Sequence, residues 1–373
     1  MKKRLTRVLY YIVMCVTMYF CQNSTGYAHE EKSPFRVIGY YRGDISEVEK
    51  FDYEKLTHLI YCFMFLHGNQ IGFKNEDSKN TLLRCLTLKK RHPHLKVLVA
   101  LGGWGGCETC SDVFSTEIGR KEFALSVASL LEQYSIDGID IDWESPVIGG
   151  YNNHKASEAD KDNFTAMIQE LRSALPDDKE ICFDANSFKE FINRSIDWNN
   201  VMPYVNFVNL MTYGLPSNKR GHTGHHSALY SSPFQYESID LAIQRLDSLN
   251  IPKNKIVIGA AFYSFVVGDV DSIMNGLGRK GKFISNMTYK ELSEQYTESQ
   301  GYEYHWDNTA KAPFLYNKTK KIFVTYDDKT SVTLKTEYAI KNRLGGIMFW
   351  KLNGDRYTNG LLDAIHTTIS VKR

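Results

Sequence analysis

The segment Asp137-Gly138-Ile139-Asp140-Ile141-Asp142-Trp143-Glu144 alternates acidic and apolar side chains. Successive side chains of a β-strand point to opposite faces, so the carboxyls at positions 140, 142 and 144 share one face. The apolar side chains on the other face suit packing against helices, so the carboxyls have to point into the interior of a closed sheet. Apolar residues would be more stable there, and the pattern therefore favours a catalytic role for these acids.

Eight apolar, β-branched runs, this segment among them, are predicted to be strands. They span residues 37–41, 59–65, 96–102, 136–144, 181–185, 205–213, 256–261 and 345–350. Most are hydrophobic along their length, as are parallel strands that are covered on both faces. Between them apolar residues recur at helical spacing, most clearly at 119–134, 159–175, 238–249 and 332–343. This alternation predicts the α/β class and a (β/α)8 TIM barrel.

The connection between residues 261 and 345 is too long for a single loop and helix. Residues 263–326 supply aromatic and strand-like pieces without the spacing of another βα unit. We predict a small α+β insertion between strands 7 and 8 that forms one wall of a groove.

The N-terminus has the features of an export signal. Residues 2–7 include four basic side chains, an apolar run covers 8–21, and Gly26-Tyr27-Ala28 places small residues at a cleavage position. We predict a signal peptide at 1–28 and a secreted or periplasmic protein. The apolar run is too short for a membrane anchor, and bulky residues before Cys21 disfavour a lipoprotein, so we expect no stable membrane insertion after cleavage.

The charge balance excludes one class of partner. The formal net charge of +2 falls by four to −2 when residues 1–28 are removed, because that segment holds four basic and no acidic side chains. Nucleic-acid binding therefore has no electrostatic support. The hydrophobic content of 43% and charged content of 24% are those of an ordinary globular protein, and we expect a monomer.

Five cysteines follow the predicted signal, so at least one is unpaired: Cys62, Cys85, Cys107, Cys110 and Cys182. Cys107 and Cys110 form a C-x-x-C in a glycine-rich loop, without a second pair at zinc-ribbon spacing. We predict a local disulfide in this loop.

The three carboxyls on the strand face cannot all ionise easily. Side chains two residues apart stand about 7 Å apart, so in a low-dielectric interior at least one keeps its proton near neutrality. Glu144 is nearest the C-terminal end of the strand, where barrel active sites are built, and we expect it to be the general acid. Cation sites draw oxygens from turns rather than from one strand face, so we expect no metal and no cofactor.

The pattern D-x-x-D-x-D-x-E at 137–144 resembles the signature of glycoside hydrolase family 18, the chitinases and related enzymes. The resemblance runs from about Phe35 to the C-terminus and implies one catalytic barrel at 33–373. It also implies hydrolysis of β-1,4 linkages in chitin or in oligosaccharides that contain N-acetylglucosamine.

Several strand ends extend the resemblance. Residues 100–104 are similar to the S-x-G-G motif, with Ala100 in place of the serine, and 211–214 to M-x-Y-D, with Gly214 in place of the aspartate. Ser264-Phe265 stands where G-R often follows the seventh-strand tyrosine. The residues implied in sugar binding are Tyr40, Phe63, Gly103, Trp104, Met211 and Trp350, with Trp306 as a further aromatic candidate.

The family is an exception among retaining glycosidases, because it uses the N-acetyl group of the substrate as the nucleophile. The resemblance implies that Glu144 protonates the leaving oxygen and then acts as base towards water. Asp142 would orient the acetamido N–H, Asp140 would share a proton or hydrogen bond with Asp142, and Tyr213 would donate to the acetamido oxygen.

Two other functions remain open. An endo-β-N-acetylglucosaminidase acting on N-glycans shares the acidic motif, although the insertion favours a chitinase-like groove. A chitinase-like carbohydrate-binding protein with weak or no activity is kept open by Ala100 and Gly214, whereas the presence of Glu144 argues against it.

Overall fold

The computed structural model describes residues 35–151 and 154–372. The predicted signal peptide at 1–28 lies outside these residues. None of the described helices has the length and apolar character needed to cross a membrane.

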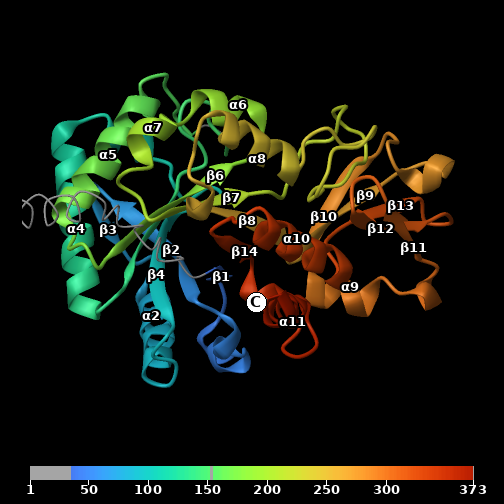
Figure 1. Cartoon of the computed structure of the whole chain (residues 1–373), viewed down its shortest axis with the longest axis horizontal. Coiled ribbons are helices and arrows are strands. Elements are labelled where there is room, and N and C mark those ends of the chain that lie inside the picture. The colour runs from blue at the N-terminus through green and yellow to red at the C-terminus, as the bar shows by residue number, and fades with distance from the viewer. Residues whose placement is uncertain (1–34, 152–153, 373) are drawn as a thin grey trace, which may run out of the picture. The chain divides into compact units, whose positions relative to one another are not determined.

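Eight parallel strands form a closed barrel (Figure 1), because each pairs with the next and the last, β14, pairs with β1. They are β1 Arg36–Tyr41, β2 His58–His67, β4 Lys96–Gly102, β5 Gly138–Asp142, β6 Glu180–Asn186, β7 Phe207–Met211, β8 Ile256–Ala261 and β14 Gly346–Trp350. A short strand, β3 (Gln70–Gly72), pairs antiparallel with the end of β2. The predicted TIM barrel is confirmed.

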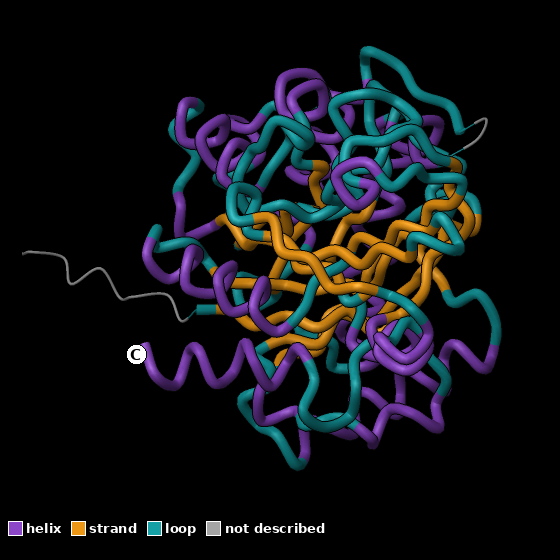
Figure 2. The backbone as a smooth tube through the Cα atoms, turned by 90° about the vertical axis from the view of Figure 1, so that its right-hand side faces the viewer, coloured by secondary structure: helices purple, strands orange, loops and turns teal. Residues whose placement is uncertain are grey.

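Helices surround the strands of the barrel (Figure 2). The α-helices are α2 Glu76–Thr87, α3 Cys110–Phe114, α4 Glu117–Tyr134, α5 Asp160–Ala174, α6 Lys189–Arg194, α7 Trp198–Val201, α8 Ile239–Ser248, α9 Tyr289–Gln295, α10 Lys329–Lys341 and α11 Leu361–Lys372. Short 3-10 helices span Ile45–Lys50, Tyr53–Lys55, Leu88–Lys90, Lys253–Lys255, Ile273–Gly276, Glu298–Gln300 and Leu352–Gly354.

Side-chain caps fix where several of these helices begin. The side chains of Thr116 and Ser238 accept hydrogen bonds from the first-turn amides of α4 and α8. Asp328 and Ser331 cap each other reciprocally at the start of α10. Such caps satisfy backbone N–H groups that have no partner inside the helix.

The two faces of β5 enter different cores, as the alternation predicts. Ile139, Ile141 and Trp143 join the large core between strands and helices, where the Trp143 ring lies 5.6 Å from that of Phe114. The fully buried Asp140 and the almost fully buried Asp142 point into the barrel, whose interior core is much smaller.

β5 is shorter than predicted, since it ends at Asp142 rather than at Glu144. The neighbouring β4 turns away at Gly102 and Gly103, which have φ angles of 107° and 77°. The amide of Gly103 makes the last cross-strand hydrogen bond, to the carbonyl oxygen of Asp142 (2.9 Å). Glu144 therefore lies just beyond the sheet, at the C-terminal end of the barrel.

Between β8 and α10 the chain forms a five-stranded antiparallel sheet in the order β10-β9-β13-β12-β11, drawn in orange in Figure 1. Its strands are β9 Tyr263–Gly268, β10 Lys282–Thr288, β11 Glu303–Asp307, β12 Ala312–Asn317 and β13 Ile322–Thr325. This sheet has apolar clusters of its own. β9 follows β8 almost directly, which brings the start of this sheet to the C-terminal end of the barrel.

A buried ion pair ties α10 to the barrel. Nζ of Lys335 lies 2.6 Å from both carboxylate oxygens of Asp327 and 2.6 Å from Oγ of Ser227, and both charged side chains are fully buried. Oδ2 of Asp327 also accepts a hydrogen bond from the amide of Ala261 at the end of β8 (2.8 Å). One pair thus joins three segments that are distant in sequence.

Candidate active site

A cleft of about 870 Å³ opens at the C-terminal ends of the barrel strands, with the start of the inserted sheet along one side. Most of the residues implied by the sequence line it: Tyr40, Phe63, Trp104, Asp142, Glu144, Met211, Tyr213 and Trp350. Asp140 lies deeper, inside the barrel.

Glu144 is the acid best placed to exchange a proton with a molecule in the cleft. Burial raises the pKa of its carboxyl to about 7, because the charged form loses hydration in an apolar surrounding. At neutral pH the two protonation states are therefore similarly populated. That is the property required of a group that acts as an acid in one step and as a base in the next.

Asp142 presents a buried polar atom that is not satisfied. Its side chain is 4% exposed, and its Oδ1 has no hydrogen-bond partner within residues 35–151 and 154–372. Burial raises the pKa of this carboxyl strongly, and the charges of Glu144 and Asp140 raise it further. Buried polar groups are almost always paired, so an unpaired carboxyl oxygen at the cleft points to a ligand.

Asp140 is held firmly from several sides. Its Oδ2 accepts a hydrogen bond from the hydroxyl of Tyr40 (3.0 Å), and its Oδ1 accepts one from the thiol of Cys182 (3.0 Å). The side-chain amide of Asn209 donates to the same Oδ1 over a longer distance of 3.4 Å. Burial raises the pKa of Asp140, and these hydrogen bonds oppose the shift.

The sequence interpretation missed a fourth interior carboxyl, that of Asp184 on β6. It accepts a hydrogen bond from the hydroxyl of Tyr40 (2.7 Å) and shares another with Asp140. Burial, followed by the charges of Asp140 and Asp142, raises its pKa. Cys182 and Asp184 alternate with apolar residues in the predicted strand at 181–185, so the same alternation as on β5 places both side chains inside the barrel.

Tyr213 lies two residues beyond the end of β7, and its hydroxyl is largely free. The one acceptor for that hydroxyl among the described residues is the sulfur of Met348, at 3.8 Å. Its ring meets that of Tyr263 edge to face at 5.9 Å. A Cβ at Gly214 would lie 3.9 Å from the hydroxyl of Tyr263, so there is space for a side chain, but the φ of 65° lies in the left-handed region that favours glycine.

Aromatic rings form the base of the cleft. Trp350 stacks on Phe63 with 5.6 Å between ring centroids and lies 5.9 Å from Tyr40. Gly103 supports this arrangement without lining the cleft, because a Cβ there would come within 2.3 Å of the Phe63 ring. Flat apolar rings of this kind suit the apolar face of a sugar.

The rim of the cleft carries Trp104, which is 63% exposed and meets Tyr151 edge to face at 5.7 Å. A disulfide between Cys107 and Cys110 closes the loop that follows, as predicted. Trp306 lies on β11 and donates to Asn308 (3.2 Å). It does not line the cleft, because the inserted sheet places β11 at the opposite edge from β10, and its role in sugar binding stays a prediction.

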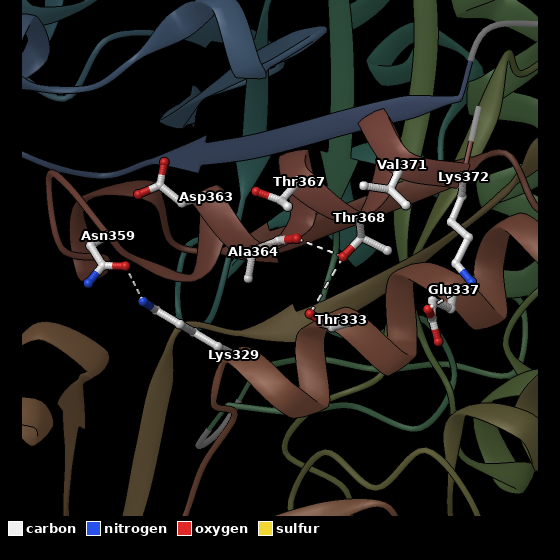
Figure 3. Close-up of a pocket in the computed structure, with 10 residues that line it drawn as sticks. All are labelled: Lys329, Thr333, Glu337, Asn359, Asp363, Ala364, Thr367, Thr368, Val371 and Lys372. Atoms are coloured by element: carbon white, nitrogen blue, oxygen red, sulfur yellow. Dashed lines mark hydrogen bonds and ion pairs between the residues drawn. The ribbon is translucent and has the colours of Figure 1, made fainter.

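A second hollow, of about 440 Å³, lies between α10 and α11 (Figure 3). Its charged groups are already paired with their neighbours: Lys329 donates to Asn359, and Lys372 lies 3.2 Å from Glu337. It lacks the buried acids of the cleft. In the described part of the chain, no group of three or more His, Cys, Asp or Glu side chains is arranged to hold a metal ion.

Comparison with known proteins gives a consistent result. The model of the family "Glycosyl hydrolases family 18" matches residues 36–355. Chitinase A1 of Niallia circulans is 30% identical over 72% of this chain, and the match spans 42% of that longer protein. Probable chitinase 2 of Drosophila melanogaster is 27% identical over 83% of this chain and 68% of its own length. A glycoside hydrolase family 18 N-acetylglucosaminidase structure from Paenibacillus barengoltzii has a TM-score of 0.80 and 31% identity, covering 90% of this chain and 100% of that one.

Proposed function

The chain belongs to family 18 of the glycosyl hydrolases, and on that premise we propose that it is a chitinase that hydrolyses β-1,4 linkages between N-acetylglucosamine units with retention of configuration. One observation carries the proposal. A carboxyl with a pKa of about 7, that of Glu144, lies in the cleft two residues after Asp142, whose Oδ1 has no partner among the residues described.

In the first step the acetamido oxygen attacks C1 of the same sugar unit, while the bond from C1 to the leaving oxygen breaks. Glu144 donates its proton to that oxygen. The unpaired Oδ1 of Asp142 accepts a hydrogen bond from the acetamido N–H. The hydroxyl of Tyr213, whose one acceptor among the described residues is the distant sulfur of Met348, donates to the acetamido oxygen. Because nucleophile and electrophile belong to one bound molecule, the attack gains the advantage of high effective molarity.

The product of this step is a cyclic oxazolinium ion. Its positive charge favours the ionised form of Asp142, whose pKa is raised in the free protein by burial and then by Glu144 and Asp140. In the second step Glu144, now a carboxylate, takes a proton from water as the water attacks C1. The ring opens, the acetamido group is restored and Glu144 regains its proton.

The function is tested by incubating a soluble chitin hexasaccharide with the protein and measuring the products by mass spectrometry. Products of two to four units indicate cleavage within the sugar chain. Single units released from one end indicate an N-acetylglucosaminidase, which is the activity named for the similar protein from Paenibacillus barengoltzii. A high-mannose N-glycan in a parallel reaction tests for endo-β-N-acetylglucosaminidase activity. Tight sugar binding without any cleavage would favour a carbohydrate-binding protein instead.

The pH dependence of hydrolysis follows from Glu144. The first step needs its protonated form, and burial places its pKa at about 7. We therefore expect kcat/KM to fall as pH rises through about 7, approaching a tenfold loss per pH unit well above it. Initial rates on a chitin oligosaccharide from pH 5 to pH 9 measure this, and a rate that stays constant up to pH 9 would remove Glu144 as the general acid.

We also propose that the protein is exported and that residues 1–28 are removed. The disulfide between Cys107 and Cys110 is compatible with an oxidising compartment. N-terminal sequencing of protein recovered from the medium or the periplasm is expected to begin at His29. Recovery of the chain only inside the cytoplasm, with Met1 still present, would contradict export.

A further inference from the structure

The buried thiol of Cys182 contacts the carboxyl of Asp140 directly. In the parallel register of the barrel, Asp140 on β5 lies between Ala100 on β4 and Cys182 on β6. All three side chains are fully buried, and both of the neighbours belong to the interior core of the barrel. The side chain of Ala100 has no hydrogen-bond donor, so of these two strand neighbours only Cys182 can donate to Asp140 through its side chain.

The thiol is well placed to donate. Its sulfur lies 3.0 Å from Oδ1 of Asp140, whereas the next acceptor, the carbonyl oxygen of Ile139, is 3.7 Å away. Burial and the adjacent Asp140 raise the pKa of the thiol well above its usual value, so it keeps its proton. The other interior thiol, that of Cys62, donates instead to the backbone of Ile60.

The remaining donors to Asp140 are shared with other groups. The hydroxyl of Tyr40 has one hydrogen, yet it lies 2.7 Å from Asp184 and 3.0 Å from Asp140. Asn209 makes its shorter contact, 2.7 Å, with Tyr40 and reaches Asp140 only at 3.4 Å. In residues 35–151 and 154–372, the hydrogen bond from Cys182 to Asp140 is thus neither shared with Asp184, as that of Tyr40 is, nor as long as that of Asn209.

We propose that Cys182 is a positioning residue, whose thiol fixes the carboxyl of Asp140 from β6 and takes the place that a serine hydroxyl at position 100 would take from β4. This inference rests on the proposed function only for its consequence in catalysis. Asp140 in turn lies two residues from Asp142 on the same strand face, so its orientation and charge act on the residue that binds the acetamido group.

Three variants test the proposal. Cys182→Ala removes the donor to a carboxylate and is expected to lower kcat about tenfold with little change in KM, because Cys182 does not touch the sugar. Cys182→Ser keeps a donor and is expected to stay within about threefold of the wild type. Adding Ala100→Ser to Cys182→Ala supplies a hydroxyl from the other side of Asp140 and is expected to restore most of the lost rate.

Cys85→Ala is the matched control. Cys85 is equally buried but lies in the outer core between strands and helices, so its truncation is expected to lower stability without changing kcat or the pH profile. If Cys182→Ser is as slow as Cys182→Ala, and Ala100→Ser restores nothing, Cys182 only fills space and the proposal is overturned.

A second measurement separates this proposal from the proposed function. The infrared S–H stretching band of Cys182 is isolated as the difference between wild type and Cys182→Ala, and a donating thiol is expected to absorb at lower frequency than Cys85 does. A lowered band in a protein that cleaves no chitin oligosaccharide would refute the proposed function but support the hydrogen bond. A band that is not lowered would overturn the proposal even if the enzyme is active.

Discussion

Replacing Glu144 with glutamine is expected to reduce kcat on a chitin oligosaccharide by roughly 10²- to 10⁴-fold, which is the contribution of a positioned general acid and base. The amide keeps the shape of the side chain but can neither release a proton to the leaving oxygen nor accept one from water. Since the pKa of the Glu144 carboxyl is about 7, the wild-type group can do both near neutral pH.

The variant also separates binding from chemistry. The aromatic base of the cleft and the unpaired oxygen of Asp142 remain in Glu144→Gln, so the Kd for the oligosaccharide, measured by calorimetry, is expected to stay close to its wild-type value. Glu190→Gln on the exposed surface of α6 is the matched control, because Glu190 only pairs with Arg194. A Glu144→Gln protein that retains more than about half of the wild-type kcat would contradict the assignment of the general acid.

Replacing Lys335 with methionine is expected to lower the free energy of unfolding by about 3–5 kcal/mol, since it leaves the buried charge of Asp327 without its partner. Both side chains are fully buried, and the pair joins α10 to Ser227 and to the end of β8. Loss of one partner therefore weakens the contacts that join α10, the segment at Ser227 and the end of β8.

Urea unfolding followed by circular dichroism measures this effect. The double variant Lys335→Met with Asp327→Asn is expected to recover part of the loss, because it removes the second charge while keeping an acceptor for the amide of Ala261. If the single variant unfolds at the same urea concentration as the wild type, the ion pair does not contribute to stability as described.

The barrel and three of the acids could be predicted from sequence because both depend on local patterns. Apolar strand runs recur between amphipathic helices, and the alternation on β5 alone determines that Asp140 and Asp142 face inwards. The end of β5 was harder to predict. It depends on Gly102 of the neighbouring strand, where β4 leaves the sheet and removes the partner that residues 143 and 144 would need.

The partners of the acids depend on register between strands that are distant in sequence. Cys182 lies beside Asp140 because β6 pairs with β5 at that level, a relation that neither segment reveals alone. The position of Trp306 also depends on strand order, because an aromatic residue inside the insertion can lie at the cleft or away from it, and the order of the sheet places β11 away from the cleft.

The most direct test of substrate-assisted hydrolysis is the anomeric configuration of the first product, followed by proton NMR from the moment a chitin oligosaccharide is mixed with the protein. Two displacements at C1, the first by the acetamido group and the second by water, predict that the β-anomer of the new reducing end appears first and then mutarotates. Initial formation of the α-anomer would show a single direct displacement by water and would contradict the account, as would the absence of any new reducing end.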